Sequence, residues 1–228
     1  MMDVSICTAC MNREELLIQA LETWINIPVK EIIIVDWSSL NPLKSILAKF
    51  QDPRIKILEV LGKQYYNQSK ASNLKVRASS GNTILSIDCD IKLSTDFFET
   101  HSMDEKVFYH GDVRKHPGTT GTCLMSRKMF LESNGYNEFM NGWGYHDLDF
   151  YKRLVSIGFE EKYIQDTSIQ HIEHEESSRV INYEMKNKLF SNIENKKIAK
   201  KNNWTPANKM ENQSISIFTL DGMYSTIM

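Results

Sequence analysis

Two carboxylates one residue apart, Asp88 and Asp90, follow a short apolar run that begins after Gly81. An apolar run of this length between turn signals predicts a buried strand. Because side chains alternate along a strand, both carboxylates are expected to point to one side and Cys89 to the other. Ligands of open α/β sheets bind beyond the carboxyl ends of the strands, so this pair predicts a site for a hard divalent cation that holds a phosphate. The alternative is a capped strand end with two solvated acids, because D-x-D is a short motif.

A further acid stands in the run from Gly142 to Asp149, which reads GWGYHDLD. Trp143 lies between two glycines, and glycine loosens the local backbone, so Trp143 is expected on a mobile or closely approached loop. Asp147 falls in the first turn of the following helix, where the macrodipole favours a carboxylate. If it faces a cleft, Asp147 could act as a general base on a sugar hydroxyl. The alternative is a helix N-terminal acid beside a packed Trp.

Two histidines, His171 and His174, end a strand that is predicted late in the chain. Neutral imidazole suits a borderline cation such as Mn²⁺ better than Mg²⁺ or Ca²⁺. Residues three apart on an extended strand face opposite sides, so only one of the two histidines is expected to bind a metal.

Polar residues also follow the first two predicted strands, namely Thr8, Arg13 and Asp36. An acid at the end of the second strand can accept hydrogen bonds from a uracil or a ribose, and Arg13 at the same edge could bind a base or a phosphate. The alternatives are that Asp36 only caps its strand and that Arg13 only belongs to the first turn of a helix.

A polar stripe formed by Lys70, Asn73 and Arg77 lies on a predicted helix, because these residues are three and four apart. A stripe that faced the cleft would meet a diphosphate. The alternative is a solvated outer face, which is where most Lys and Arg side chains lie.

Cys7 and Cys10 have the spacing of a redox pair. A redox C-x-x-C needs its first Cys at the start of a helix, whereas Cys7 lies within a predicted strand. With no second C-x-x-C and no secretory signal, reduced thiols are expected rather than a zinc site or a disulfide framework.

The composition of the 228-residue chain, 41% hydrophobic and 25% charged, is ordinary for a soluble globular protein with one substantial core or two small domains. Its net charge of −2 gives no bulk basicity that would argue for nucleic-acid binding. No apolar run approaches the length of a membrane span. The first residues lack the basic and apolar regions of a signal peptide.

Strands and helices are expected to alternate through the first half of the chain. The strands are predicted at 4–8, 31–36, 54–60 and 84–87, and the helices at 12–25, 41–50 and 66–79. Asn12 is expected to cap the first helix, with Glu15 completing a capping box. Alternation of this kind implies parallel strands joined by right-handed crossovers, which is the α/β class.

The pattern changes after Asp90. Short strands are predicted at 107–110, 122–125, 159–164 and 168–172, helices at 126–135 and 146–157, and one or two helical turns at 95–101. A long Lys- and Asn-rich helix with a sparse apolar stripe is predicted from Arg179 to about Lys201, and residues 215–220 could add an edge strand. The expected organisation is a domain at 1–176 with a C-terminal helical extension and tail at 177–228 packed on it.

Three stretches together resemble the GT-A glycosyltransferases. NREELL at 12–17 is similar to the start of the donor site in β-1,4-galactosyltransferases, and LSIDCD at 85–90 is similar to their strand that ends in D-x-D. The stretch at 121–154 resembles their segment around NGF and GWGxED, which chondroitin-polymerase-like members of family 2 share; here it reads GTCLMSRKMFLESNGYNEFMNGWGYHDLDFYKRL. The resemblance runs from about Val4 to His174, and its third stretch is the most specific.

The resemblance implies a GT-A fold, with a Rossmann-like nucleotide-binding half and a mixed central sheet flanked by helices. It implies metal-dependent, inverting transfer of a hexose or an N-acetylhexosamine from a nucleotide sugar, first of all a UDP-sugar, to a hydroxyl of a saccharide acceptor. No stem or membrane anchor is found, so a soluble bacterial or viral enzyme is expected, located in the cytoplasm or peripherally at a membrane. The C-terminal helix is expected to pack on the core or on a second chain, and contact of this Lys-rich helix with a membrane surface is the alternative.

The resemblance also implies roles for individual residues. With the polar stripe included, the expected donor-site residues are Thr8, Arg13, Asp36, Tyr66, Lys70, Asn73, Arg77, Asp88 and Cys89. The expected pocket for the sugar and the acceptor contains Trp143, Gly144 and His146. Mn²⁺, or alternatively Mg²⁺, would be bound by Asp90 and His171, with Asp88 and His174 as alternates. Asp147 would be the base that deprotonates the acceptor hydroxyl.

One position departs from the family pattern, which has a Glu that contacts the acceptor or the donor sugar where this chain has His146. The identity of the sugar therefore stays open. Two other classes also stay open. A sugar nucleotidyltransferase would be expected to have a Gly-rich phosphate loop after the first strand, which the sequence CTACMNR lacks. An inactive sugar-binding or scaffold protein need not keep Asp90, Asp147 and His171, and all three are present.

Overall fold

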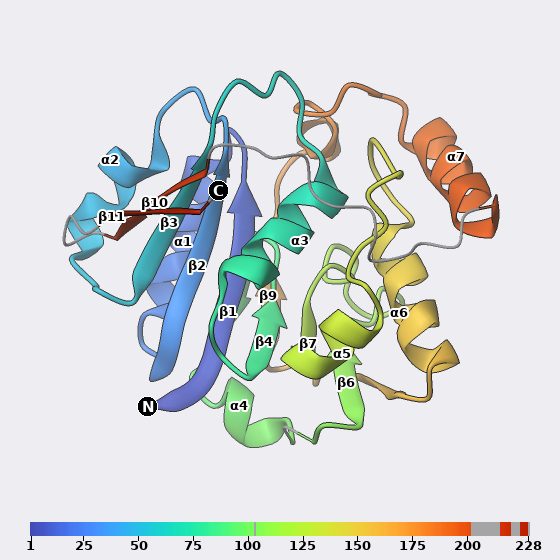
Figure 1. Ribbon diagram of the computed structural model, residues 1–228, viewed down its shortest axis with the longest axis horizontal. Coiled ribbons are helices and arrows are strands. Elements are labelled where there is room, and N and C mark those ends of the chain that lie inside the picture. Colours follow the sequence, from blue (N-terminus) through green and yellow to red (C-terminus); the bar gives the residue numbers. More distant parts are fainter. Residues whose placement is uncertain (103, 202–214, 220–223, 228) are drawn as a thin grey trace.

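The computed structural model describes residues 1–102, 104–201, 215–219 and 224–227. Its main element is a mixed sheet with the strand order β11-β10-β3-β2-β1-β4-β7-β6-β8 (Figure 1). The strands of this sheet are β1 (Met2–Cys10), β2 (Val29–Trp37), β3 (Ile55–Val60), β4 (Thr83–Ser86), β6 (Val107–His110), β7 (Cys123–Ser126), β8 (Glu160–Tyr163), β10 (Ile215–Thr219) and β11 (Tyr224–Ile227). Two short strands, β5 (Ile91–Leu93) and β9 (Ile169–His171), form a separate antiparallel pair.

The strands β3, β2, β1 and β4 are all parallel, which confirms the alternation predicted for the first half of the chain. The helical segments are α1 (Glu14–Trp24), α2 (Leu43–Leu47), η1 (Ala48–Phe50), α3 (Gln68–Ala78), α4 (Phe97–Thr100), α5 (Arg127–Glu132), α6 (His146–Ser156), η2 (Glu176–Arg179) and α7 (Lys188–Lys201). The strand β7 runs antiparallel to both β4 and β6, so the sheet is mixed, as expected.

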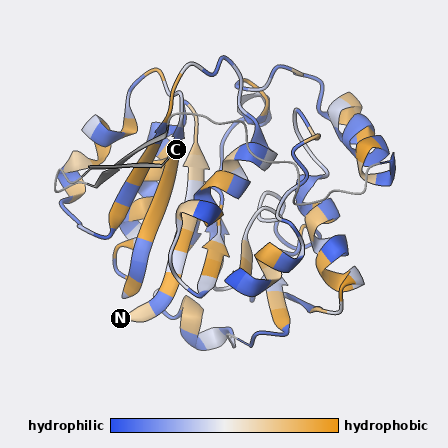
Figure 2. Ribbon diagram, viewed as in Figure 1, coloured by the Kyte–Doolittle hydropathy of each residue, from blue (hydrophilic) through white to orange (hydrophobic). Residues whose placement is uncertain are grey.

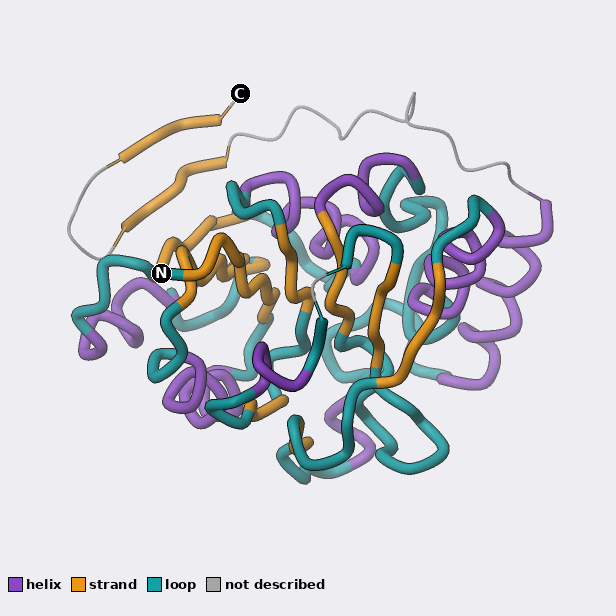
Figure 3. The backbone as a smooth tube through the Cα atoms, turned by 90° about the horizontal axis from the view of Figure 1, so that it is seen from below, coloured by secondary structure: helices purple, strands orange, loops and turns teal. Residues whose placement is uncertain are grey.

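Apolar side chains cover both faces of the sheet. Along β1, Val4 and Ile6 belong to one buried cluster together with Trp24 of α1, whereas Cys7 belongs to a second cluster together with Leu74 of α3. This follows from the alternation of side chains along a strand that is buried on both sides. Figure 2 shows the resulting apolar strands in the centre of the molecule, and Figure 3 shows helices on both sides of the strand layer.

The segment that follows the Asp88–Asp90 turn is attached to the core by Trp24. This side chain is fully buried, and its Nε1 donates a hydrogen bond to the carbonyl oxygen of Ile91 at 3.0 Å. Because Ile91 is bonded covalently to Asp90, the buried indole restrains the position of that acid from the opposite side of the sheet.

The first helix begins differently from the prediction. Asn12 has a φ of +54° and forms no helix cap. Its side chain instead accepts a hydrogen bond from the backbone N–H of Leu40 at 2.7 Å and donates one to Asn182 at 3.1 Å. The predicted capping box is therefore wrong, because tertiary partners occupy the Asn12 side chain, and Arg13 takes the position before the helix without a capping bond.

The long helix predicted from Arg179 is also wrong in its first half, because η2 ends at Arg179 and α7 begins only at Lys188. The chain between them lies against the ends of β1 and α3. Asn182 donates to the carbonyl oxygen of Met11 at 2.6 Å, and its own carbonyl oxygen accepts from the backbone N–H of Tyr66 at 2.7 Å. These contacts replace the helical hydrogen bonds that the local sequence would permit.

The predicted strand at 215–220 is confirmed for Ile215–Thr219, whereas Leu220 lies outside the described residues. It is β10, which pairs antiparallel with β3, and β11 lies beyond it, so β10 is not the edge of the sheet. Within the described ranges, the helices are too short or too polar to cross a membrane.

Candidate active site

A cavity of about 450 Å³ lies at the carboxyl ends of β1 and β4. Its walls come from residues 9–13, the turn at 88–90, the loop at 113–121, the loop and helix start at 143–148, and the segment at 176–192. Binding beyond the carboxyl ends of parallel strands is the general rule for open α/β sheets. The C-terminal segment from residue 177 is therefore one wall of the cavity rather than only a layer packed on the domain.

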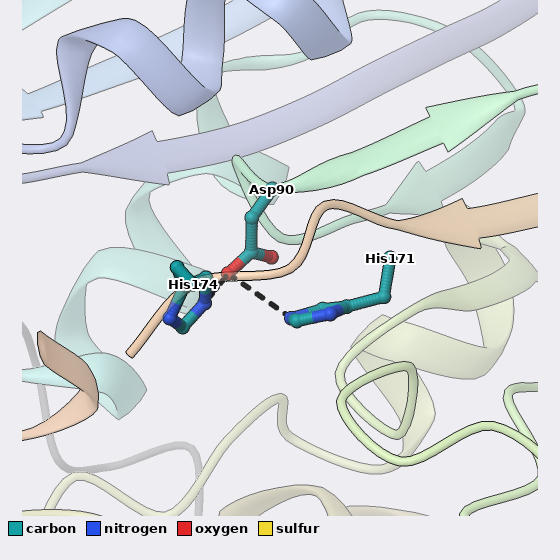
Figure 4. Close-up of side chains that lie close together, drawn as sticks. All are labelled: Asp90, His171 and His174. Carbon is teal, nitrogen blue, oxygen red and sulfur yellow. Dashed lines mark hydrogen bonds and ion pairs between the residues drawn. The ribbon is translucent and has the colours of Figure 1, made fainter. Parts of the chain in front are cut away.

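Asp90, His171 and His174 form a cluster beside this cavity (Figure 4). One potential ligand atom from each residue lies within 4.8 Å of the other two. Asp90 Oδ2 is 2.9 Å from His174 Nε2 and 3.7 Å from His171 Nε2. Ligand atoms around one first-row cation at about 2.1–2.3 Å lie roughly 3 Å apart, so these separations are close to those of a shared ion.

The environment of the cluster fits a borderline divalent cation. Asp90 is 3% exposed, and its Oδ1 is buried without a hydrogen-bond partner. His174 Nδ1 lies 2.9 Å from the hydroxyl of Ser178, a contact that orients the ring with Nε2 toward Asp90. Burial raises the pKa of Asp90, but hydrogen bonds from His171 and His174 outweigh burial and hold that pKa well below its usual range. An anionic oxygen with two imidazoles suits Mn²⁺.

The expectation that only one of the two histidines binds a metal stays a prediction, although both imidazoles lie near Asp90. It assumed that both lie on one extended strand, but β9 ends at His171. His174 lies in the irregular chain beyond the strand, where alternation no longer applies, and its ring turns back to Asp90 (Figure 4). Strand alternation does not apply to the two acids either. The strand β4 ends at Ser86, and both Asp88 and Asp90 lie in the chain that follows it. Both acids nevertheless line the cavity, and so does Cys89.

Arg13 supplies positive charge next to the cluster of Asp90, His171 and His174. Its guanidinium lies 3.2 Å from Asp90 Oδ2 and 2.6 Å from His174 Nε2, and the residue lines the cavity. A planar guanidinium at this place is suited to phosphate oxygens.

Asp147 lies in the first turn of α6 and on the cavity wall, as predicted. Its Oδ1 is buried without a hydrogen-bond partner. Burial, followed by the charge of Asp88, raises the pKa of Asp147 from 3.8 to about 7, and Lys75 partly opposes this rise. A carboxyl group whose pKa lies near neutrality can both accept and release a proton, which is the property of a general base.

The Trp143 loop, residues 141–145, packs against α7. Asn195 of α7 donates to the carbonyl oxygen of Gly144 at 2.8 Å, and Lys188 Nζ lies 4.1 Å from the centre of the Trp143 ring. Gly142 and Gly144 have φ angles of +72° and +94°, which explains the glycines on both sides of the Trp. Of the two expectations, a mobile loop or a closely approached one, the structure shows the second, because Ser191 and Asn192 of α7 lie directly against Gly142 and Gly144.

The fold and the site can be compared with known proteins. Residues 100–175 match a family model described as the N-terminal domain of galactosyltransferase. The catalytic domain of Drosophila β1,4-galactosyltransferase 7, in complex with xylobiose, superimposes with a TM-score of 0.64 at 16% identity, covering 98% of this chain and 91% of that one. This chain has the GT-A fold. The predicted resemblance to GT-A glycosyltransferases is confirmed, since the family model and the structural neighbours are glycosyltransferases.

Two further GT-A structures superimpose on a smaller share of their own chains. Mannosyltransferase PcManGT from Pyrobaculum calidifontis, in complex with GDP-Man and Mn²⁺, has a TM-score of 0.58 at 13% identity and matches 72% of this chain and 55% of that one. GalNAc-T7 with UDP, GalNAc and Mn²⁺ has a TM-score of 0.62 at 13% identity and matches 79% of this chain and 44% of that one. The comparison with curated proteins gave no match.

Of the residues expected to hold the nucleoside, Tyr66 lines the cavity, beside Tyr183 at a ring separation of 5.4 Å. Thr8 is fully buried and does not line the cavity. Asp36 does not line it either, because its two carboxylate oxygens accept the backbone N–H groups of Ser39 and Leu43 at 3.0 and 2.9 Å. Asp36 therefore has the capping role that was the alternative.

The expectation that Lys70, Asn73 and Arg77 face the cavity is wrong, because none of them lines it. Asn73 is buried on the other side of α3, where it bonds both the N–H and the carbonyl of Tyr136 at 2.7 and 2.8 Å. Arg77 is exposed. The three residues differ in burial, and of α3 only Gln68 lines the cavity.

His146 lines the cavity, but both of its ring nitrogens are bonded to other parts of the protein. The side chain is therefore not free to contact a sugar as predicted. Its Nδ1 lies 3.0 Å from Ser69 Oγ, and its Nε2 lies 3.0 Å from the carbonyl oxygen of Gly142. Burial lowers the pKa of His146 to about 4, so the ring is neutral and donates through one nitrogen only. Both ring nitrogens are therefore used to join α3 to the Trp143 loop.

Sequence reasoning missed Lys75, which is 2% exposed and has its Nζ 3.4 Å from the carbonyl oxygen of Ile87. Its charge acts on Asp88 and Asp147, and burial lowers its own pKa. A signal was present, because Lys75 follows Ala71 by four positions on the apolar stripe of α3. The wall residues Arg179, Asn182 and Lys188 were missed because a continuous helix was expected there.

The four cysteines are free and buried within the described structure, as expected for reduced thiols. Burial raises the pKa of Cys7 to about 12, so this thiol lacks the thiolate character that a redox pair needs.

Proposed function

We propose that this protein is a metal-dependent, inverting glycosyltransferase that moves a hexose or an N-acetylhexosamine from a UDP-sugar to a hydroxyl of a saccharide acceptor. The observation that carries the proposal is the presence of two kinds of group at one cavity: a cation-binding cluster at Asp90 and a carboxyl group with a near-neutral pKa at Asp147. The GT-A fold supports the same reading, and structures of this fold have been obtained with Mn²⁺ and nucleotide or nucleotide-sugar ligands.

The donor diphosphate is assigned to the side of the cavity next to Asp90, His171 and His174. Asp90, His171 and His174 would hold Mn²⁺, with Mg²⁺ as the alternative, and the cation when bound supplies Lewis-acid stabilisation of the departing nucleoside diphosphate. Arg13 lies against the cluster and adds a second positive charge for phosphate oxygens. Tyr66 offers its ring to the base, at the end of the cavity that also contains Tyr183.

Asp147 is assigned as the base that removes the proton from the acceptor hydroxyl. The carboxyl groups lining the cavity belong to Asp88, Asp90, Asp147 and Glu176. Asp90 belongs to the proposed cation site, Asp88 lies two residues before it and is its alternate ligand, and Glu176 is ion-paired with Arg179 at 2.9 Å. Asp147 keeps an unpartnered oxygen and a pKa of about 7, so near neutral pH it can take up the proton as the acceptor oxygen attacks the anomeric carbon.

Trp143 is assigned to the sugar and acceptor part of the cavity. The ring is only partly buried and lies on the same wall as Asp147. Because α7 backs this loop, the loop and the helix together would exclude water from the anomeric centre and so limit hydrolysis of the donor.

The test is release of UDP or GDP from a panel of nucleotide sugars, beginning with UDP-galactose, UDP-N-acetylgalactosamine and UDP-glucose and including GDP-mannose. Turnover of one donor that requires Mn²⁺ and stops with EDTA would establish a transferase and name its sugar. Asp90→Asn should abolish this turnover. Once an acceptor is found, Asp147→Asn should abolish transfer, whereas Asp149→Asn should not, because Asp149 lies in the same helical turn but pairs with Arg153 at 3.0 Å outside the cavity.

A panel in which no donor turns over, and none binds with Mn²⁺ in calorimetry, would overturn the proposal in favour of an inactive scaffold. Release of pyrophosphate from a nucleoside triphosphate and a sugar phosphate would instead identify a nucleotidyltransferase.

A further inference from the structure

The side of α7 that faces the rest of the protein is polar. Ser191 and Asn195 are fully buried, four residues apart on one face of the helix. Asn195 donates to the carbonyl oxygen of Gly144, and Ser191 donates to that of Asn141 at 3.3 Å. Both buried side chains thus bond the Trp143 loop, and the half-buried Ile198 is the large apolar residue nearest to them on this side of the helix.

The opposite side of α7 is apolar in its first half. Leu189 is 70% exposed, Phe190 53% and Ile193 43%. At 100° per residue, all three lie on the side of the helix away from Ser191 and Asn195. An amphipathic helix normally turns its apolar side inward, so α7 has the reverse orientation. Figure 1 places α7 at the right-hand margin of the molecule, and the exposures of the three side chains show that this side faces solvent.

The same outward side is basic in its second half. Four exposed lysines lie three, four, seven and eight residues after Ile193, namely Lys196, Lys197, Lys200 and Lys201. The helix contains a single acid, Glu194, which pairs with Lys197 at 2.6 Å. The whole chain has a net charge of −2, so this positive patch is local and does not reflect an overall basic protein. We call the outward apolar and basic side of α7 the α7 outer face.

We propose that the α7 outer face docks on an anionic lipid surface. Leu189, Phe190 and Ile193 would enter the boundary between headgroups and acyl chains. The lysines on the following turns of the same face would meet the anionic headgroups, and each adds electrostatic attraction to the surface. A second copy of the chain fits this face poorly. A two-fold contact sets the same patch against itself, so the lysines would meet either lysines or apolar side chains.

The test is sedimentation of the purified protein with vesicles, which needs no donor, acceptor or activity and is therefore independent of the proposed function. Vesicles of phosphatidylcholine alone are compared with vesicles of equal parts phosphatidylcholine and phosphatidylglycerol. The expected result is binding to the second and little binding to the first, weakened by added salt. Replacing Leu189, Phe190 and Ile193 together by Ser should lower binding at least about tenfold, because apolar burial is lost.

Two matched variants separate the face from general surface effects. Replacing Leu131, Val155 and Ile157 by Ser removes three apolar side chains of similar exposure (60%, 47% and 48%) from α5, α6 and the turn after α6, and it should leave binding unchanged. Replacing the four lysines of the face by Gln keeps the apolar residues and should also lower binding at least about tenfold, since each lysine near an anionic surface contributes roughly fivefold. Circular dichroism checks that each variant is folded.

Absence of binding to either vesicle overturns the proposal, as does equal binding to both. The proposal is also overturned if the Leu189, Phe190 and Ile193 variant and the Leu131, Val155 and Ile157 control lose vesicle binding equally. A protein that is dimeric in solution, and becomes monomeric on replacing Leu189, Phe190 and Ile193, would assign the face to a second copy instead.

Discussion

Replacing Asp147 by Asn should stabilise the protein at alkaline pH while removing the proposed base. Burial and the charge of Asp88 raise the pKa of Asp147 from 3.8 to about 7. The folded protein therefore binds more protons than the unfolded chain between these two pH values. Stability falls wherever the folded state binds more protons and the pH rises. The wild type should thus lose stability as the pH rises from about 4 through 7, whereas the amide of the Asp147→Asn variant would not titrate.

The size of the effect follows from the two pKa values. A change from 3.8 to about 7 corresponds to a difference on the order of 4 kcal/mol between the protonated and ionised forms in the folded state. This figure is a ceiling, because water that reaches the cavity screens the ionised carboxylate. We expect Asp147→Asn to exceed the wild type by about 2–4 kcal/mol in free energy of unfolding at pH 8 and to match it within about 1 kcal/mol near pH 4.

The assay is urea unfolding followed by circular dichroism from pH 4 to 8.5, with EDTA present so that no cation neutralises the neighbouring acids. Asp96→Asn, at an exposed carboxyl before α4, is the control and should show no pH-dependent gain. The reasoning would be refuted if the free energies of unfolding of Asp147→Asn and the wild type differed by the same amount at every pH in this range. It would mean that Asp147 is hydrated in the folded protein and titrates as it does in the unfolded chain.

Three further predictions concern the metal, its support and the Trp143 loop. Mn²⁺ at about a hundred times its dissociation constant should raise the wild-type melting temperature by roughly 5–10 °C in a thermal melt. The melting temperature of Asp90→Asn should rise by less than about 2 °C at the same Mn²⁺ concentration. Equal rises would exclude Asp90 as a ligand. Trp24→Phe removes the bond to Ile91 and should cost about 1–3 kcal/mol in urea unfolding and weaken Mn²⁺ binding in calorimetry, and unchanged affinity would remove its supporting role. Gly142→Ala should cost about 2–3 kcal/mol in the same unfolding assay, because a φ of +72° disfavours Ala and the new methyl would lie 2.3 Å from Ser191 Oγ. Adding Ser191→Ala should recover part of that loss, and additive losses would contradict the contact.

The parallel half of the fold was predictable because its signals are local. Apolar runs such as the one in β2 and the turn residues between them determine strand, helix and direction without knowledge of distant partners. Asp147 was predictable for the same reason, since its place in the first turn of α6 depends only on the glycines before it. The convergence of His174 on Asp90 was not, because it depends on where β9 ends.

Residues whose roles depend on tertiary partners could not be predicted from spacing. Asp36 has the sequence context of a ligand-binding acid, and only the folded chain brings the N–H groups that occupy both of its oxygens. The spacing of Lys70 and Asn73 defines a common face but not its direction. Asn182 looked like a helical residue, because nothing near it in sequence shows that it bonds Met11.

The bonds of Asn182 also bear on how the site forms during synthesis. They join Asn182 to Asn12 and Met11, which lie 170 and 171 residues earlier in the chain. The parallel strands can pair as soon as they leave the ribosome, because domains generally begin to fold from their N-terminal part. The wall formed by residues 176–192 and both histidines arrive only with the last third of the chain, and such distant contacts form late. A nascent chain halted before His171 would therefore contain the parallel strands and Asp90, but it would lack both histidines of the proposed cation site.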